Sequence, residues 1–172
     1  MPQEPDNRPL PDDWQAWLAR HRAHLFLLAR QYLATPQDAE DSVQEGFIRF
    51  WNARHKAKDP AAYLFTCVRT AAIDVRRARL TRHRYESAIP QPPAPPLFSA
   101  PLEQSERRDQ IEAALGRLSQ DQREVLVLKI WADLSFTQIA ETLNVPVSTA
   151  ASRYRYAIQH LGLVLTREVH CD

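Results

Sequence analysis

The stretch over residues 134–161, LSFTQIAETLNVPVSTAASRYRYAIQHL, constrains the fold of this chain more than any other. Ser135 with Gln138 three residues later forms a capping box, which predicts the start of a short helix. Asn144 tolerates the left-handed backbone that a tight turn needs, and Pro146 cannot continue the first helix. A second helix is expected to begin one or two residues later. The stretch therefore predicts a helix-turn-helix.

The second of these helices has two unlike faces. One face is apolar at helical spacing and is expected to be buried: Ala150, Tyr154, Ala157, Ile158 and Leu161. The opposite face is polar and basic: Ser148, Ser152, Arg155, Tyr156 and Gln159, with Thr149 and Arg153 on its flank. Two arginines without an acid suit a helix that lies in the major groove of DNA. An ordinary helical hairpin with a solvated face is the alternative interpretation.

The rest of the chain also favours helices. Helical periodicity recurs along the 172 residues. The chain has only three glycines, and this small number argues against a sheet rich in tight turns. A first helix is expected over residues 12–33. Two more helices begin at Thr35-Pro36 and Asp59-Pro60, where an N-cap residue precedes proline at the first helical position. Another capping box, Ser119 with Gln122, begins a helix that runs through Trp131.

A proline-rich segment divides the chain. Residues 86–102 hold six of the thirteen prolines and no helical pattern, which is typical of a linker. The predicted fold class is all-α, with two small helical domains over residues 12–84 and 104–165. The Pro-rich linker spans residues 85–103, the second domain contains the helix-turn-helix, and the tail after Leu165 is expected to fray.

The helix that begins at Pro36 has an outward face of unusual composition. Its core stripe is expected to pack inward, with Gly46 allowing a close neighbour. The side away from the core carries Asp41, Gln44, Glu45 and the apolar Ile48. An apolar residue among acids and amides indicates a docking surface, although a solvated helix face explains the same pattern.

The third helix ends in a strongly basic segment. Five arginines and one histidine lie within residues 76–84, and the segment holds no acid. Such a cluster is the electrostatic footprint of a protein that binds a polyanion. A solvated basic helix end is the alternative interpretation.

Composition excludes several classes of protein. Apolar and charged residues make up 44% and 25% of the chain, which is normal for a soluble globular protein. No apolar run approaches the length of a membrane span, and the polar N-terminus does not resemble a signal peptide, so a cytoplasmic location without membrane insertion is expected. Two cysteines form no disulfide framework, and His21 with His24 lacks a third metal ligand. No catalytic constellation is found, so no enzymatic activity, cofactor or metal is expected.

Three segments in a fixed order are specific to one family. They are DAEDSVQEGFIRFW, then YLFTCVRTAAIDVRRAR, then, after the linker, ALGRLSQDQREVLVLKIWADLSFTQIAETLNVPVSTAASRYRYAIQHL. Together they resemble the bacterial sigma-70 family, in particular its extracytoplasmic-function (ECF) group. The resemblance covers both helical domains and fails only at the chain ends and the linker.

The resemblance implies a subunit that binds core RNA polymerase and directs promoter recognition, DNA opening and transcription initiation. Residues 12–84 would be region 2 and residues 104–165 region 4. In region 2, the outward residues Asp41, Gln44, Glu45 and Ile48 would dock on the clamp helices of the largest polymerase subunit. The segment over residues 59–77 would hold the minus-ten element, and the residues that would meet phosphates are Arg69, Arg76 and Arg77.

In region 4, the resemblance places the helix that follows the turn in the major groove of the minus-thirty-five element. Ser152, Arg155 and Tyr156 would read base edges, Arg153 would also contact DNA, and Thr137 and Thr149 would lie near phosphates. ECF proteins are usually held by an anti-sigma factor, so the expected partners are core RNA polymerase, promoter DNA and an anti-sigma factor.

The sequence departs from the family at three positions. Ala151 stands where a basic residue is usual, Tyr154 where leucine or isoleucine is common, and Thr70 where the family often has asparagine. The recognition helix is therefore less basic than usual, and weak binding of isolated region 4 to the minus-thirty-five element is expected. Tethering to polymerase would raise its effective concentration. Two alternatives stay open: a stand-alone helix-turn-helix regulator and a helical adaptor.

Overall fold

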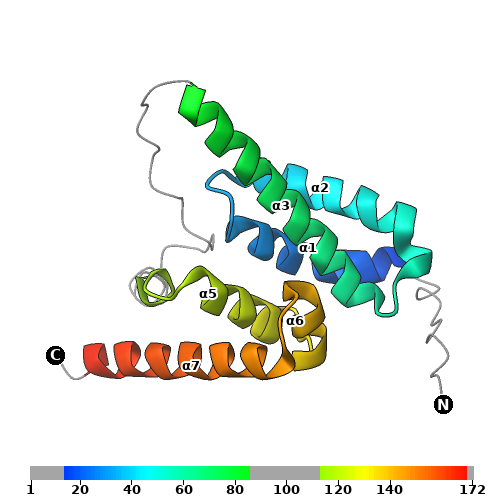
Figure 1. The fold of residues 1–172 in the computed structure, drawn as a ribbon. Coiled ribbons are helices and arrows are strands. Elements are labelled where there is room, and N and C mark those ends of the chain that lie inside the picture. The colour runs from blue at the N-terminus through cyan, green and yellow to red at the C-terminus, as the bar shows by residue number, and fades with distance from the viewer. Residues whose placement is uncertain (1–13, 86–112, 170–172) are drawn as a thin grey trace, which may run out of the picture.

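A computed structural model describes residues 14–85 and 113–169 (Figure 1). Within these ranges the chain is helical and contains no strand, which confirms the all-α prediction. The elements are α1 (Trp14–Arg30), α2 (Pro36–Ala53), the 3-10 helix η1 (Arg54–Lys56), α3 (Pro60–Tyr85), α5 (Gln120–Leu126), the π-helix η3 (Val127–Trp131), α6 (Phe136–Leu143) and α7 (Val147–Val169). The linker predicted at 85–103 lies outside the described residues, except for Tyr85, and the description resumes with a helical turn at 113–116.

The predicted helix starts are confirmed by their local hydrogen bonds. The backbone N–H of Asp38 donates to the Thr35 hydroxyl over 3.2 Å at the start of α2. Both predicted capping boxes, at Ser119 and at Ser135, are complete at the starts of α5 and α6. Asn144 ends α6 in the left-handed region, with φ and ψ both 53°. These four features use only residues close in sequence, which is why the sequence predicted them.

The helix ends were predicted less well. α1 ends at Arg30 and not at Leu33, because the Arg30 guanidinium donates to the carbonyl groups of Leu33 and Ala34 at 2.7 and 2.6 Å. The helix after Ser119 does end at Trp131 as predicted, but its last turn is the π-helix η3, where the Lys129 ammonium donates to the Leu134 carbonyl over 3.0 Å. α7 continues to Val169, beyond the expected start of the tail.

Replacing Thr35 by alanine is expected to lower the free energy of unfolding by about 1 kcal/mol, the usual cost of losing an N-cap. The substitution removes the acceptor of the Asp38 N–H while it leaves the helix interior unchanged. Urea denaturation followed by circular dichroism measures the loss. Thr70→Ala is a matched control, because Thr70 is exposed and its hydroxyl bonds to the Thr66 carbonyl one turn earlier in α3. An equal loss in both variants would show that the cap of α2 contributes nothing special.

Helices α2 and α3 pack at very close range at Gly46. A Cβ atom on Gly46 would lie 2.5 Å from the Val68 Cα and 2.7 Å from the Val68 nitrogen. Glycine is therefore required here by the backbone of α3. The close approach brings Phe50 and Leu64 into the core, where both are fully buried.

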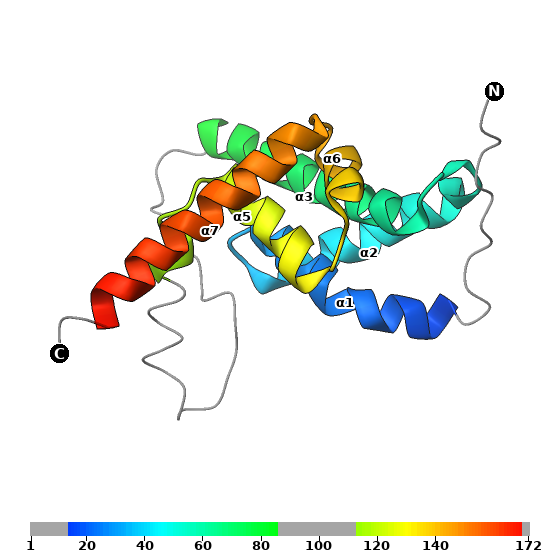
Figure 2. The ribbon, with the colours of Figure 1, turned by 90° about the horizontal axis from the view of Figure 1, so that it is seen from below.

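The two groups of helices share one hydrophobic core. Figures 1 and 2 show α1–α3 as one layer, with α5, α6 and the N-terminal half of α7 beneath it. A continuous cluster of buried residues joins the layers and includes Leu28, Phe65, Val125, Leu128 and Ile139. It is formed where α3 packs on α6 and α1 packs on η3. We call α1–α3 the N-terminal module and α5–α7 the C-terminal module.

A smaller cluster lies inside the C-terminal module. Leu118 and Leu126 pack there against Ala157 of α7, with Tyr154 and Leu161 partly buried beside them. The prediction that Ile158 would be buried is wrong, since 41% of it is exposed. The face of α7 that packs inward is already formed by Ala150, Tyr154, Ala157 and Leu161. Ile158 lies at the edge of that face. In the parts of the chain that the structure describes, no helix is both long enough and apolar enough to cross a bilayer.

Candidate nucleic-acid interface

The basic half of α3 carries three of the residues predicted to bind DNA. Arg77 is exposed, and so is Arg76, whereas Arg69 is half-buried. Arg69 and Arg76 are seven residues apart and therefore share one face of the helix. That face is turned toward the C-terminal module. Nearby, Arg79 forms an ion pair with Asp38 at the start of α2.

Arg69 forms an ion pair with Glu124 across the two modules. The Arg69 Nε atom lies 3.1 Å from the Glu124 Oε2 atom. The Glu124 side chain is only 3% exposed, and the Arg69 side chain is 26% exposed. Burial by itself would lower the pKa of Arg69, but the neighbouring Tyr32 and Glu124 outweigh it and raise that pKa. Arg69 is thus held fully charged in a poorly solvated place.

Three further hydrogen bonds join the modules. The Arg76 guanidinium donates to the Gln120 side chain over 2.9 Å. The Gln138 amide donates to the Asp59 carboxylate over 2.7 Å, in the loop that precedes α3. The Thr142 hydroxyl also reaches the Ala62 carbonyl, at 3.3 Å. The face of α3 predicted to hold the minus-ten element is therefore in contact with α5 and α6.

The helix-turn-helix presents the face that the sequence predicted. Arg155 and Tyr156 are exposed on α7, and Thr137 is exposed on α6. Thr149 and Ser152 are half-buried, and the Ser152 hydroxyl donates to the Thr149 carbonyl over 3.0 Å. Arg153 forms an ion pair with Asp121 of α5, so its guanidinium is directed toward its own module. The exposed part of this face remains basic and aromatic.

The outward face of α2 is exposed as predicted. Asp41, Gln44, Glu45 and Ile48 all face solvent, and Ile48 is 55% exposed. Glu45 lies 2.8 Å from Arg49, which also pairs with Asp74 of α3 at 2.8 Å. Both carboxylates raise the pKa of Arg49, chiefly through the hydrogen bond to Asp74. This face is therefore anchored to α3 by charge as well as by packing.

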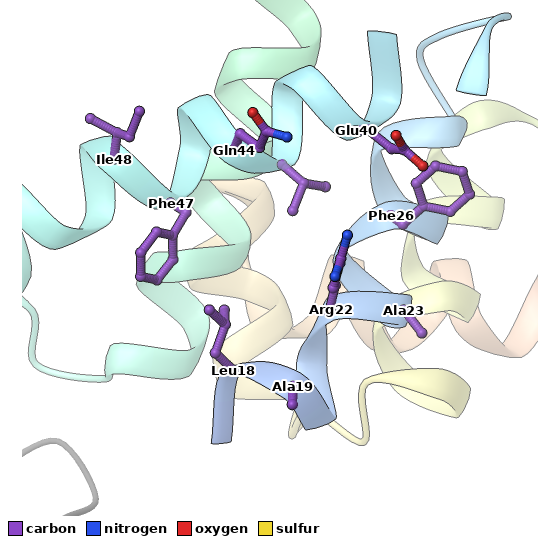
Figure 3. A pocket seen from close by; sticks show the side chains of 10 residues that line it. Leu18, Ala19, Arg22, Ala23, Phe26, Glu40, Gln44, Phe47 and Ile48 are labelled. Atoms are coloured by element: carbon purple, nitrogen blue, oxygen red, sulfur yellow. The ribbon is translucent and has the colours of Figure 1, made fainter. Parts of the chain in front are cut away.

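A groove between α1 and α2 adjoins this face. Its volume is about 660 Å³, and its lining is mainly apolar. Figure 3 shows Leu18, Arg22 and Phe26 of α1 on one side and Gln44, Phe47 and Ile48 of α2 on the other. Sequence reasoning missed the contribution of α1. The available signal was Phe26, an apolar residue of the first helix that lines the groove.

His21 and Cys67, which belong to the residue types that bind metals, pack inside the N-terminal module. His21 lies against Trp17 and Phe65, with ring centroids 4.7 and 5.9 Å apart. Burial, followed by the charges of His24 and Arg20, lowers the pKa of His21. Cys67 is buried, and this burial raises the pKa of its thiol. Among the residues that the structure describes, no three His, Cys, Asp or Glu side chains come close enough to hold a metal ion.

Two family profiles match the chain. The profile for Sigma-70 region 2 covers residues 17–82, and the profile for Sigma-70, region 4 covers residues 108–161. The ECF RNA polymerase sigma factor SigL of Mycobacterium tuberculosis is 33% identical over 153 residues, which span 84% of this chain and 84% of SigL. SigK of Mycobacterium sp. strain KMS, also an ECF RNA polymerase sigma factor, is 28% identical over 158 residues, or 87% of this chain and 81% of SigK.

Two solved structures share the fold. One is the sigma factor RpoE of Bartonella quintana in complex with the anti-sigma factor NepR, with a TM-score of 0.66 and 23% identity. The match covers 90% of this chain and 97% of RpoE. The other is CnrH in complex with the cytosolic domain of CnrY, with a TM-score of 0.59 and 24% identity over 90% of this chain and 88% of CnrH.

Proposed function

The chain belongs to the ECF group of the sigma-70 family, and from this premise we propose how its surfaces divide the work of initiation. It is a transcription initiation factor that works with core RNA polymerase on promoter DNA. The proposal rests chiefly on one observation: an acidic and apolar face on α2 and basic faces on α3 and α7 occur on separate helices. Separate surfaces allow polymerase and DNA to be bound at the same time.

The outward face of α2 is assigned to the polymerase. Ile48 offers an exposed apolar contact, and Asp41, Gln44 and Glu45 surround it with acceptors. The groove beside Ile48 adds apolar surface from α1. A buried apolar contact with a polar rim is the usual anatomy of a protein–protein interface. We assign this surface to the clamp helices of the largest polymerase subunit.

Replacing Ile48 by aspartate is expected to weaken binding to core polymerase about thirtyfold, the effect of losing one well-placed contact of about 2 kcal/mol. The substitution puts a charge where an apolar side chain would be desolvated. Titration of labelled chain with core polymerase, followed by fluorescence anisotropy, measures the affinity. Leu80→Asp is the matched control, because Leu80 is 54% exposed on the basic part of α3. Equal loss in both variants, or none in Ile48→Asp, would remove α2 from the interface.

Promoter DNA is assigned to both modules. In residues 12–84, Arg69, Arg76 and Arg77 neutralise phosphates of the minus-ten element, where unpaired bases are captured at a cost of a few kcal/mol for each unstacked base. In residues 104–165, the exposed face of α7 enters the minus-thirty-five element. There Ser152, Arg155 and Tyr156 meet base edges, and Thr137 and Thr149 lie near phosphates. Arg153 contacts DNA only after it leaves its ion pair with Asp121.

Neither module has to bind tightly, because polymerase would hold both at a fixed separation while the segment 85–103 spans between them. The chain performs no chemistry of its own and acts in the cytoplasm, where polymerase is found. An anti-sigma factor of the kind seen with RpoE is a further proposed partner.

In vitro transcription from a genomic library with purified core polymerase tests the proposed function. New start sites should appear only when this chain is added, preceded by shared minus-ten and minus-thirty-five elements. Specific binding to a palindromic duplex without polymerase would instead favour the stand-alone regulator. Failure of the chain to associate with core polymerase would overturn the proposal.

A further inference from the structure

Polar contacts between the two modules involve residues to which the proposed function assigns promoter DNA. The three side-chain pairs are Arg69 with Glu124, Arg76 with Gln120, and Asp59 with Gln138. In the first two pairs, the guanidinium group is one that the proposed function assigns to a phosphate. In the third pair, Asp59 lies in the loop before α3, within the segment assigned to the minus-ten element. These groups cannot meet DNA in the same way while the modules are packed together.

Glu124 is the most deeply buried member of these pairs. Its side chain is 3% exposed, and Arg69 is the one cation that the structure places in contact with it among the described residues. A buried carboxylate is tolerated only with such a partner, so the pair forms and separates together with the interface. The ring of Tyr32 lies 5.8 Å from the Arg69 guanidinium. Burial and then the charge of Glu124 raise the pKa of Tyr32, so its hydroxyl stays neutral and leaves Arg69 to balance the carboxylate.

A carboxylate and a phosphate offer a guanidinium the same kind of charged oxygen acceptors. Glu124 therefore binds Arg69 in the place where a DNA phosphate would bind it. The packed arrangement also buries apolar side chains from both modules, including Phe65 and Ile139. Separation of the modules exposes this surface and leaves Glu124 in water, where it no longer competes for Arg69.

We propose that the packed arrangement is an autoinhibited form of the chain, in which Glu124 substitutes for a promoter phosphate on Arg69. The inference rests on the proposed function, because that function assigns Arg69 and Arg76 to DNA. DNA that binds only the open form must overcome the closing equilibrium, so its apparent affinity falls by the fraction of open chain. The C-terminal module thus acts as an internal inhibitor of the N-terminal module.

Two substitutions at the interface shift this equilibrium in opposite directions. Glu124→Gln keeps the shape of the side chain but removes the charge that holds Arg69, so the chain opens. Gln120→Glu gives Arg76 a carboxylate in place of an amide, so the chain closes more tightly. Gln120 is the first residue of α5, where an acid also favours the helix dipole, and the variant is therefore expected to fold.

Each variant has a matched control outside the interface. Glu141→Gln makes the same charge change at an exposed position of α6. Gln37→Glu makes the second change in the first turn of α2, again at an exposed position. If only the total charge mattered for DNA binding, each control would act about as strongly as its partner, because it makes the same change in net charge.

The experiment uses the full chain with two readouts. Small-angle X-ray scattering measures the radius of gyration, and fluorescence anisotropy measures binding of a short, mixed-sequence single-stranded DNA. We expect Glu124→Gln to enlarge the chain and to bind the DNA about tenfold more tightly, the change that about 1.4 kcal/mol produces. Gln120→Glu should stay compact and bind about threefold more weakly, as expected for a partly exposed charge pair.

Unchanged affinity in Gln120→Glu overturns the inference, even if Glu124→Gln fails to fold. Equal gains in Glu124→Gln and Glu141→Gln also overturn it. Co-elution of the wild-type chain with core polymerase is measured separately, because its failure would reject the proposed function. The difference in radius of gyration between Glu124→Gln and Gln120→Glu would still report whether contacts of α3 with α5 hold the two modules together.

Discussion

Replacing Arg76 and Arg77 together by glutamate is expected to lower promoter-dependent transcription about a hundredfold at moderate salt, since each lost phosphate contact contributes to affinity and each new acid repels the DNA. Both side chains are exposed at the basic end of α3. The dependence of promoter binding on salt should weaken as well, by about two phosphate contacts. In vitro transcription with saturating core polymerase, repeated at several salt concentrations, measures both effects.

The control reverses the same number of charges elsewhere. Arg20 and Arg117 are exposed on other parts of the chain, and Arg20→Glu with Arg117→Glu should leave transcription close to the wild-type level. Loss of Arg76 also removes the bond to Gln120, so tighter packing of the modules cannot explain a fall in activity. Retained transcription in the Arg76 and Arg77 variant would support the helical adaptor instead.

Replacing Gly46 by alanine is expected to reduce the free energy of unfolding by about 3 kcal/mol, at the upper end of the usual cost of overpacking a core. The added Cβ would lie 2.5 Å from the Val68 Cα, and backbone atoms cannot move aside as a flexible side chain can. Helices α2 and α3 would have to separate, which would loosen the core around Phe50 and Leu64. Urea denaturation followed by circular dichroism measures the change.

Gly162→Ala is the control, and its effect should have the opposite sign. Gly162 lies in α7 at an exposed position, and an added Cβ would meet no atom within 4 Å. Alanine there should stabilise the chain by about 0.5–1 kcal/mol, because glycine loses more backbone entropy in a helix. Destabilisation of equal size by both substitutions would contradict the close packing of α2 on α3.

Much of the local structure could be predicted from the sequence. The caps at Thr35, Ser119 and Ser135 and the left-handed turn at Asn144 depend on bonds that span three or four residues. The exposed face of α2 followed from helical spacing alone, and the family followed from the order of three segments. Such features depend on residues that are close in sequence, so they can be predicted without knowing how distant segments pack.

Other features depended on contacts between distant segments. Ile158 fits the apolar spacing of α7, yet it is exposed because four other residues already supply the contact. The groove beside Ile48 needs α1 to lie against α2, and the outward pattern of α2 alone does not reveal that neighbour. A helical pattern states which side of one helix is apolar, but not which surfaces meet when several apolar sides are available.

By itself, the sequence determined the helices, most of their starts and the family. Only the tertiary structure decided that the modules pack together and that Arg69 is held by Glu124, 55 residues away. The physical reason is that local hydrogen bonds and helical periodicity act within one helix. The pairing of buried charges instead depends on the balance of desolvation and contact that exists only once the two surfaces have met.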